Sequence, residues 1–217
     1  MKIELKDFII ICDKELDYMP EIISTLENRT ENILNFFGLD KLSKKKNVII
    51  YSDRNKYKEH MLCYVDEFKD WMCGDTYGGD INLLVIDEAK KSKSHKNMTL
   101  DEFTKCILHE FVHSCEQEVN KTTEAISWYW EALATNLSGQ DYNVNDLSLC
   151  DFDSLQNNFN ETKYGYNYAF TIGKYMLENY PREKLLYYIS KPQLLKNEAN
   201  GIFASALRSQ PAKIKSK

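Results

Sequence analysis

Hydrophobic residues in the N-terminal part of the chain alternate between short continuous runs and helical spacings. The run at 8–12 predicts a buried strand, and apolar positions three and four apart between Pro20 and Gly38 predict a helix. A second run at 48–51 predicts another strand. The opening of the chain therefore has the order strand, helix, strand.

The same alternation continues once more. Asp53 is typical of a helix N-cap, and the apolar spacing after it predicts a helix that continues until Gly74. After Gly78 and Gly79, the apolar run at 81–86 predicts a third strand. We expect these segments to form a small mixed sheet with helices.

From the polar loop near Lys90 onward, the pattern is helical, except for an irregular stretch at 140–162. Helices are predicted near 99–119, 122–138, 163–180, 181–190 and 193–208. The fold class is α+β, with the sheet first and a mostly helical C-terminal half. No linker divides the chain, so we expect one domain over 1–205 and a short basic tail at 206–217.

Charge and composition exclude several classes of protein. The formal net charge is -5, which disfavours binding to nucleic acid or to an anionic membrane surface. The longest apolar run, 8–12, is far shorter than a membrane span, and the first residues lack a signal-peptide pattern, so a cytoplasmic location is expected. The cysteines form no C-x-x-C pair, which indicates free thiols or small buried side chains.

The strongest chemical signal is His109-Glu110-Phe111-Val112-His113, which has the form H-E-x-x-H. Thr99 and Glu102 have the spacing of a capping box, so the helix begins well before the motif. Apolar side chains from 103 to 119 cover one half of this helix, and the two histidines with Glu110 fall on the other half.

This arrangement predicts a zinc site. Imidazoles four residues apart on one helix face can bind the same tetrahedral cation. Glu110, beside the first histidine, can then accept a proton from a bound water and pass it to a leaving amine.

A catalytic zinc site needs a third protein ligand. A third histidine six residues after His113 is absent, because Val119 occupies that position. Glu131 is the best candidate, since an acid in the apolar helical stretch 127–134 is explained by a nearby cation. Glu124 is the fallback. Glu116 and Glu118 follow His113 too closely along the same helix to turn back to the metal.

The two motifs resemble the gluzincin metallopeptidases, to which thermolysin and the zinc aminopeptidases belong, and in particular the compact peptidase-MA-like domains. The segment Trp128-x-x-Glu131-Ala132-Leu133-Ala134 looks like the family's W-x-x-E-G-x-A, whose Glu supplies the third ligand. The resemblance implies a zincin-like fold, one Zn²⁺ per chain and a peptide or protein substrate. It also implies that the strand at 81–86 forms the edge along which an extended peptide lies.

The chain departs from the family at several positions. Ala132 replaces the family's Gly, and Thr135 stands where thermolysin-like members have an Asp that orients a ligand histidine. The aminopeptidase motif G-x-M-E-N is absent, and the sequence at 79–82 reads Gly-Asp-Ile-Asn, which favours endopeptidase action or a narrow substrate range. Family members also use a Tyr or His to stabilise the oxyanion, and Tyr166 or Tyr168 could supply that group.

The sequence therefore predicts a zinc peptidase with His109, His113 and Glu131 as ligands and Glu110 as general base. Two alternatives remain open. One is a non-catalytic zincin-fold binding module, against which the retention of Glu110 argues. The other is an amidase or deacylase for a non-peptide substrate, since the same chemistry attacks any polarised carbonyl.

Overall fold

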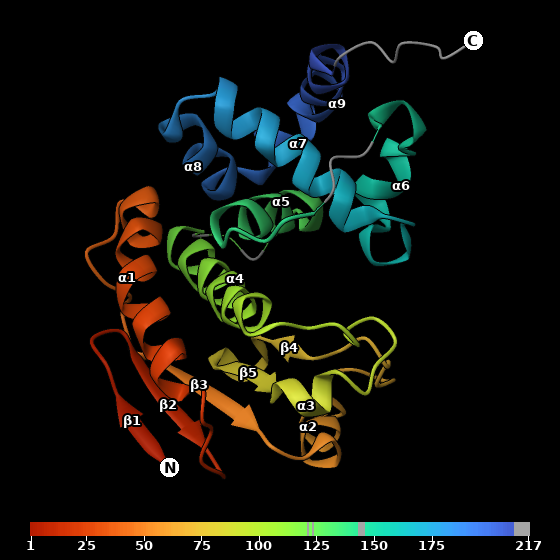
Figure 1. The fold of residues 1–217 in the computed structure, drawn as a ribbon. Coiled ribbons are helices and arrows are strands. Elements are labelled where there is room, and N and C mark those ends of the chain that lie inside the picture. Colours follow the sequence, from red (N-terminus) through yellow and green to blue (C-terminus); the bar gives the residue numbers. More distant parts are fainter. Residues whose placement is uncertain (121, 123, 143–145, 211–217) are drawn as a thin grey trace. The chain divides into compact units, whose positions relative to one another are not determined.

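The computed structural model describes residues 1–120, 122, 124–142 and 146–210, and five of its segments form one mixed sheet (Figure 1). The sheet has the order β1-β2-β3-β5-β4. Its strands are β1 (Lys2–Glu4), β2 (Phe8–Cys12), β3 (Lys46–Tyr51), β4 (Gly74–Asp75) and β5 (Ile81–Leu84). The strands β2, β3 and β5 run parallel, and β1 and β4 are antiparallel to their neighbours. The expected small mixed sheet with helices is confirmed.

The parallel strands are joined by helices α1 (Met19–Phe37) and α2 (Arg54–Met61). Gly38 ends α1 in the left-handed conformation, with φ 68°, as the glycine stop predicts. The predicted N-cap of α2 is also confirmed, because the Asp53 carboxylate accepts hydrogen bonds from the N–H groups of Asn55 and Lys56.

Helix α2 is much shorter than predicted, since it ends at Met61 and not near Gly74, which lies in β4. The apolar residues after Met61 continue the helical spacing but have other partners. Tyr64 stacks on Tyr77 with ring centroids 5.3 Å apart, and Phe68 packs edge-on against Tyr57 at 6.0 Å. Tertiary packing therefore overrides the local periodicity.

The prediction of a strand at 81–86 was wrong in two respects: the C-terminal end of the strand and its position at the edge of the sheet. It ends at Leu84, and Ile86 begins the short helix α3 (Ile86–Ala89). Strand β5 is also not an edge, because β4 pairs with it on the side away from β3. The four residues of β5 are all buried, so both faces of the sheet are covered at this strand.

The described residues divide into a first unit, Met1–Glu118, and a second unit, Val119–Lys217. The first unit ends with helix α4 (Leu100–Val119), and the second contains α5 (Ser127–Leu137), α6 (Phe152–Asn157), α7 (Gly165–Asn179), α8 (Arg182–Ser190) and α9 (Pro192–Ser209). Short 3-10 helices lie at Tyr77–Gly79, Leu147–Leu149 and Phe159–Glu161. The single-domain assignment for 1–205 stays a prediction.

The predicted helices of the second unit are confirmed with two adjustments. Helix α5 begins at Ser127 and not at 122, because Asn120 Oδ1 accepts hydrogen bonds from the N–H and hydroxyl of Thr122 in a local turn. The stretch 140–162, expected to be irregular, contains α6 and two of the 3-10 helices. Of the predicted tail 206–217, residues 206–209 belong to α9, and 211–217 lie outside the described residues.

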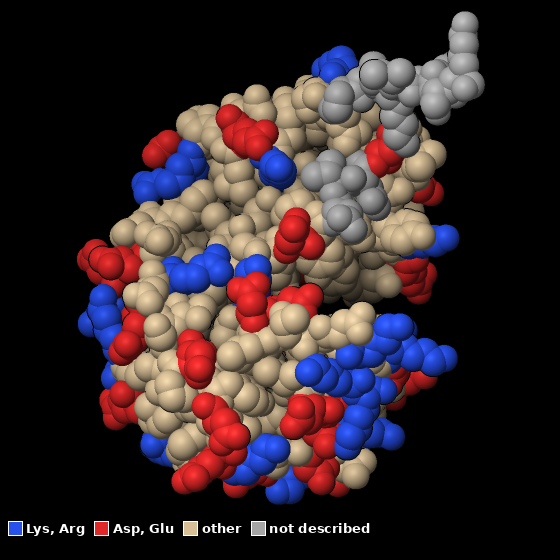
Figure 2. Space-filling model, in the orientation of Figure 1, with Lys and Arg blue, Asp and Glu red and all other residues tan. Residues whose placement is uncertain are grey.

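Surface features agree with the sequence interpretation. All six cysteines are free. None of the described helices is long and apolar enough to cross a membrane. On most of the face drawn in Figure 2, acidic and basic side chains are interspersed. The lysines at 44, 45, 90 and 91 are exposed.

Helices α5 and α7 approach closely at one glycine. A Cβ atom on Gly173 of α7 would stand 2.7 Å from the backbone oxygen of Ala132 and 2.9 Å from the Ala132 Cβ, both on α5. The Asn136 side chain, on the next turn of α5, donates to the backbone oxygens of Ala132 and Phe170, at 2.8 and 3.0 Å. The absence of a side chain at Gly173 therefore sets the spacing of the two helices.

We expect Gly173→Ala to destabilise the protein by about 1 to 3 kcal/mol, because the added methyl group overpacks this contact. Gly201→Ala is the control. Gly201 also lies inside a helix, α9, but nothing stands within 4 Å of its Cβ position. That change should stabilise by about 0.5 to 1 kcal/mol. Urea unfolding followed by circular dichroism measures both, and equal midpoints for the two variants would contradict the packing argument.

Candidate metal centre

Helix α4 carries the H-E-x-x-H motif and starts as predicted. The N–H of Thr99 donates to Glu102 Oε2 at 2.6 Å, and the N–H of Glu102 donates to Thr99 Oγ1 at 3.2 Å, which is a reciprocal capping box. The apolar face of the helix is buried within the first unit, where the ring of Phe111 lies 4.9 Å from that of Phe8 in β2. Packing of this face fixes the rotation of the helix about its axis.

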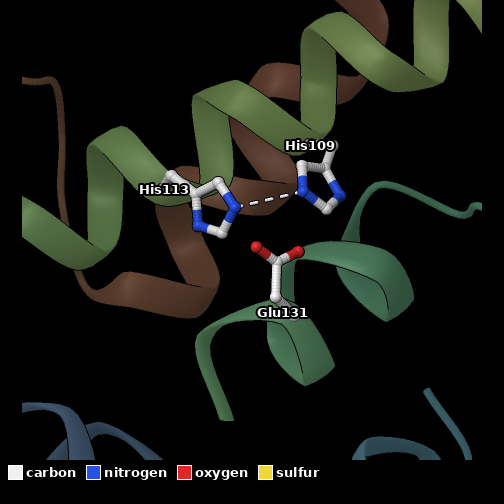
Figure 3. Close-up of side chains that lie close together, drawn as sticks. All are labelled: His109, His113 and Glu131. Atoms are coloured by element: carbon white, nitrogen blue, oxygen red, sulfur yellow. Dashed lines mark hydrogen bonds between the residues drawn. The ribbon is translucent and has the colours of Figure 1, made fainter. Parts of the chain in front are cut away.

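The opposite face presents His109 and His113 to each other. Their Nε2 atoms lie 3.1 Å apart, with the two ring planes nearly perpendicular at 86° (Figure 3). Two nitrogens bound to one tetrahedral zinc at about 2.0 to 2.1 Å would stand about 3.3 to 3.4 Å apart. The pair therefore needs a shift of only a few tenths of an ångström to meet one zinc ion.

Glu110 lies beside the edge strand of the sheet. Its Oε1 atom is 3.7 Å from the point where a Cβ on Gly74 of β4 would stand. Burial raises the pKa of the neighbouring Cys73 thiol to about 12, and the negative charge of Glu110 adds to the effect. Cys73 is therefore a neutral thiol at physiological pH, and Glu110 is the ionisable group that faces the glycine.

Glu116 makes a contact that the sequence interpretation missed. The residue is fully buried, and its Oε2 atom lies 2.7 Å from Nδ1 of His113, three residues earlier on α4. From the sequence, Glu116 was expected to lie too close to His113 along the helix to act as a metal ligand. Its place one turn after His113, in a stretch of buried residues, was the available signal.

Glu131 lies on α5, in the second unit, and is half-buried. Its helix is apolar as predicted, with Trp128, Ala132, Leu133 and Ala134 buried. His109, His113 and Glu131, all labelled in Figure 3, each offer one ligand atom, and this group of side chains could hold a metal ion. The donor set of two imidazoles and one carboxylate suits zinc.

The fallback ligand, Glu124, is exposed and forms an ion pair with Lys196 at 3.4 Å. It is not a member of the group found among the described residues. The two histidines outside the motif also stay apart from that group. His60 contacts Asp75 at 3.3 Å, and Nε2 of His95 lies 2.8 Å from the backbone oxygen of Trp71.

The two tyrosines proposed to stabilise the oxyanion have different surroundings near the start of α7. The ring of Tyr166 is half-buried between Phe159, at 5.1 Å, and Tyr142, at 6.0 Å. Tyr168 is buried, and burial raises the pKa of its hydroxyl. A raised pKa keeps this hydroxyl protonated, as a hydrogen-bond donor must be.

The edge strand β4 is held in place by a buried carboxylate. Asp75 Oδ1 accepts hydrogen bonds from the side-chain amide of Asn82 at 3.1 Å and from the N–H of Tyr77 at 2.8 Å, and it lies 3.3 Å from His60 Nε2. Both Asp75 and Asn82 are buried. This network fixes the segment that carries Gly74 beside Glu110.

Comparison with known proteins leaves the chain without an assigned family. No protein-family model matches the sequence, and no curated protein matches it significantly. The chemistry of the site is therefore argued from its own residues.

We expect Asp75→Ala to destabilise the protein by about 1 to 3 kcal/mol, because it removes the acceptor that the Tyr77 N–H and the buried Asn82 amide share. The Asn82 amide then keeps only the backbone oxygens of Tyr77 and Asp80, each at 3.2 Å. Asp75→Asn keeps an acceptor oxygen and should lose less. The exposed Asp66 provides the control, since Asp66→Ala should change stability by no more than about 0.5 kcal/mol. Urea unfolding measures all three variants, and equal effects of Asp75→Ala and Asp66→Ala would rule out the anchoring role.

Proposed function

We propose that the protein is a zinc-dependent peptidase of the gluzincin type, with His109, His113 and Glu131 as metal ligands and one Zn²⁺ per chain. The observation that carries the proposal is the 3.1 Å separation of the two Nε2 atoms on a helix that also bears Glu110. A zincin-like arrangement of the fold is part of the same proposal.

Zinc bound by these residues would lower the pKa of a coordinated water toward neutrality and polarise the substrate carbonyl. Glu110 accepts the proton of the attacking water and delivers it to the leaving amine. Tyr166 or Tyr168 donates a hydrogen bond to the oxyanion. The Cβ position of Gly74 lies 3.7 Å from Glu110 Oε1, an ordinary van der Waals distance, so β4 borders the Glu110 carboxylate.

Metal content tests the ligand set. Elemental mass spectrometry of the purified wild-type protein should give about one zinc per chain, since three protein ligands hold the ion. His113→Ala and Glu131→Gln should lose most of this zinc. His95→Ala removes a histidine outside the group and should retain it. Wild-type protein that holds no zinc, even after incubation with zinc salt, would exclude the metallopeptidase assignment.

A second test separates binding from catalysis. Glu110→Gln should retain zinc but lose about 10² to 10⁴-fold in turnover, because the amide cannot accept the proton of the water. Cleavage of a peptide library and of a panel of small amides provides the assay. Glu118→Gln, which removes an equal charge from the same helix, should keep its activity.

The outcomes also separate the alternatives. Cleavage of small amides without cleavage of peptides would favour an amidase or deacylase. Zinc binding by wild-type protein without hydrolysis of either substrate class would favour a non-catalytic zincin-fold module. Undiminished turnover of Glu110→Gln would remove Glu110 from the role of general base.

A further inference from the structure

The contact between Glu116 and His113 restricts which ring nitrogen of the imidazole carries the proton. The carboxylate oxygen lies 2.7 Å from Nδ1, the Glu116 side chain is fully buried, and the His113 side chain is 12% exposed. An ionised carboxylate only accepts hydrogen bonds. With Glu116 ionised, the proton of a neutral His113 ring therefore sits on Nδ1 and is donated to Glu116.

This proton position leaves the lone pair on Nε2, the nitrogen that faces His109. Only a nitrogen with a free lone pair can bind a metal. We propose that Glu116 is a positioning residue of the metal centre, which holds His113 in the tautomer and orientation that zinc binding requires. The inference rests on the proposed zinc site and adds a residue that no ligand motif contains.

The residue that would be expected to orient a histidine in gluzincins is absent here. At that position the chain has Thr135, which is fully buried, and its hydroxyl donates to the backbone oxygens of Glu131 at 2.6 Å and Ala132 at 3.3 Å. Thr135 is thus hydrogen-bonded within its own helix. Glu116 supplies a carboxylate to a ligand histidine from the zinc helix itself.

The burial of Glu116 supports a role for its carboxylate in holding His113. A carboxylate removed from water is costly unless it has strong hydrogen-bonding partners, and the His113 ring is such a partner. Carboxylates that accept from a metal-bound histidine fix its ring and raise its basicity, and their removal typically weakens metal binding about 10 to 100-fold. We assign this role to Glu116.

Zinc affinity is the first measurement, made by competition with a chelator of known affinity on the full chain. Glu116→Ala should weaken zinc binding about 10 to 100-fold. Glu116→Gln should show a smaller loss, because its amide oxygen still accepts from Nδ1 but carries no charge. Glu118→Gln is the matched control and should bind as wild type, since the Glu118 carboxylate accepts from the N–H of Ser43 at 3.0 Å.

The tautomer of His113 gives a readout that a purely structural role would not move. In the zinc-free protein at alkaline pH, nitrogen NMR of the ring should find the proton on Nδ1 in wild type and in Glu118→Gln. In Glu116→Ala both tautomers of His113 should be populated, with the proton on Nδ1 in one and on Nε2 in the other. If Glu116→Ala does not fold, judged by circular dichroism, the zinc affinity of Glu116→Gln provides the comparison, because its amide keeps the acceptor but carries no charge.

Wild-type zinc affinity or an unchanged Nδ1 proton in a folded Glu116→Ala would overturn the inference. If Glu116→Ala does not fold, wild-type zinc affinity of Glu116→Gln would overturn it. If the wild type binds zinc and Glu116→Ala binds it weakly but neither hydrolyses an amide, the peptidase assignment fails and the role of Glu116 stands. If the wild type binds no zinc, both fail.

Discussion

The short distance between the Nε2 atoms of His109 and His113 is the constraint on which the site depends. At 3.1 Å, two N–H groups cannot face each other, and two lone pairs repel unless a proton or a cation lies between them. Both histidines stand on α4, so a rotation of the helix about its axis leaves this distance unchanged, and only their side-chain torsions alter it. The spacing of the motif along one helix face therefore brings the two imidazoles together.

The parts predicted well from the sequence are those in which local signals and tertiary packing agree. The strand at 8–12, the stop of α1 at Gly38 and the capping box at Thr99 are each specified by nearby residues, and all three are confirmed. Glu131 likewise lies in an apolar helix, as the composition of 127–134 predicted. Its role as a ligand stays a prediction.

The parts predicted poorly depend on contacts distant in sequence. Gly74 reads as a helix stop, yet it lies in an edge strand, because the aromatic residues before it pack on Tyr57 and Tyr77 and not on a continued helix. Glu116 reads as a misplaced ligand, since its place one turn after His113 suggests a contact but does not show that its carboxylate reaches the Nδ1 atom. In both cases the direction in which the side chains point decides between the two interpretations, and the three-dimensional fold sets that direction.

The brevity of strand β4 has a consequence for recognition of a substrate. Its pairing with β5 covers two residues, Gly74 and Asp75, so an extended peptide added to this edge gains only a few backbone hydrogen bonds. Each contributes about 0.5 to 1.5 kcal/mol net, which limits backbone-only affinity to roughly the millimolar range. Tight binding of the proposed peptide substrate would then come from side-chain pockets or from a folded partner. Its selection would thus depend on the shape of the substrate more than on the length of the extended segment.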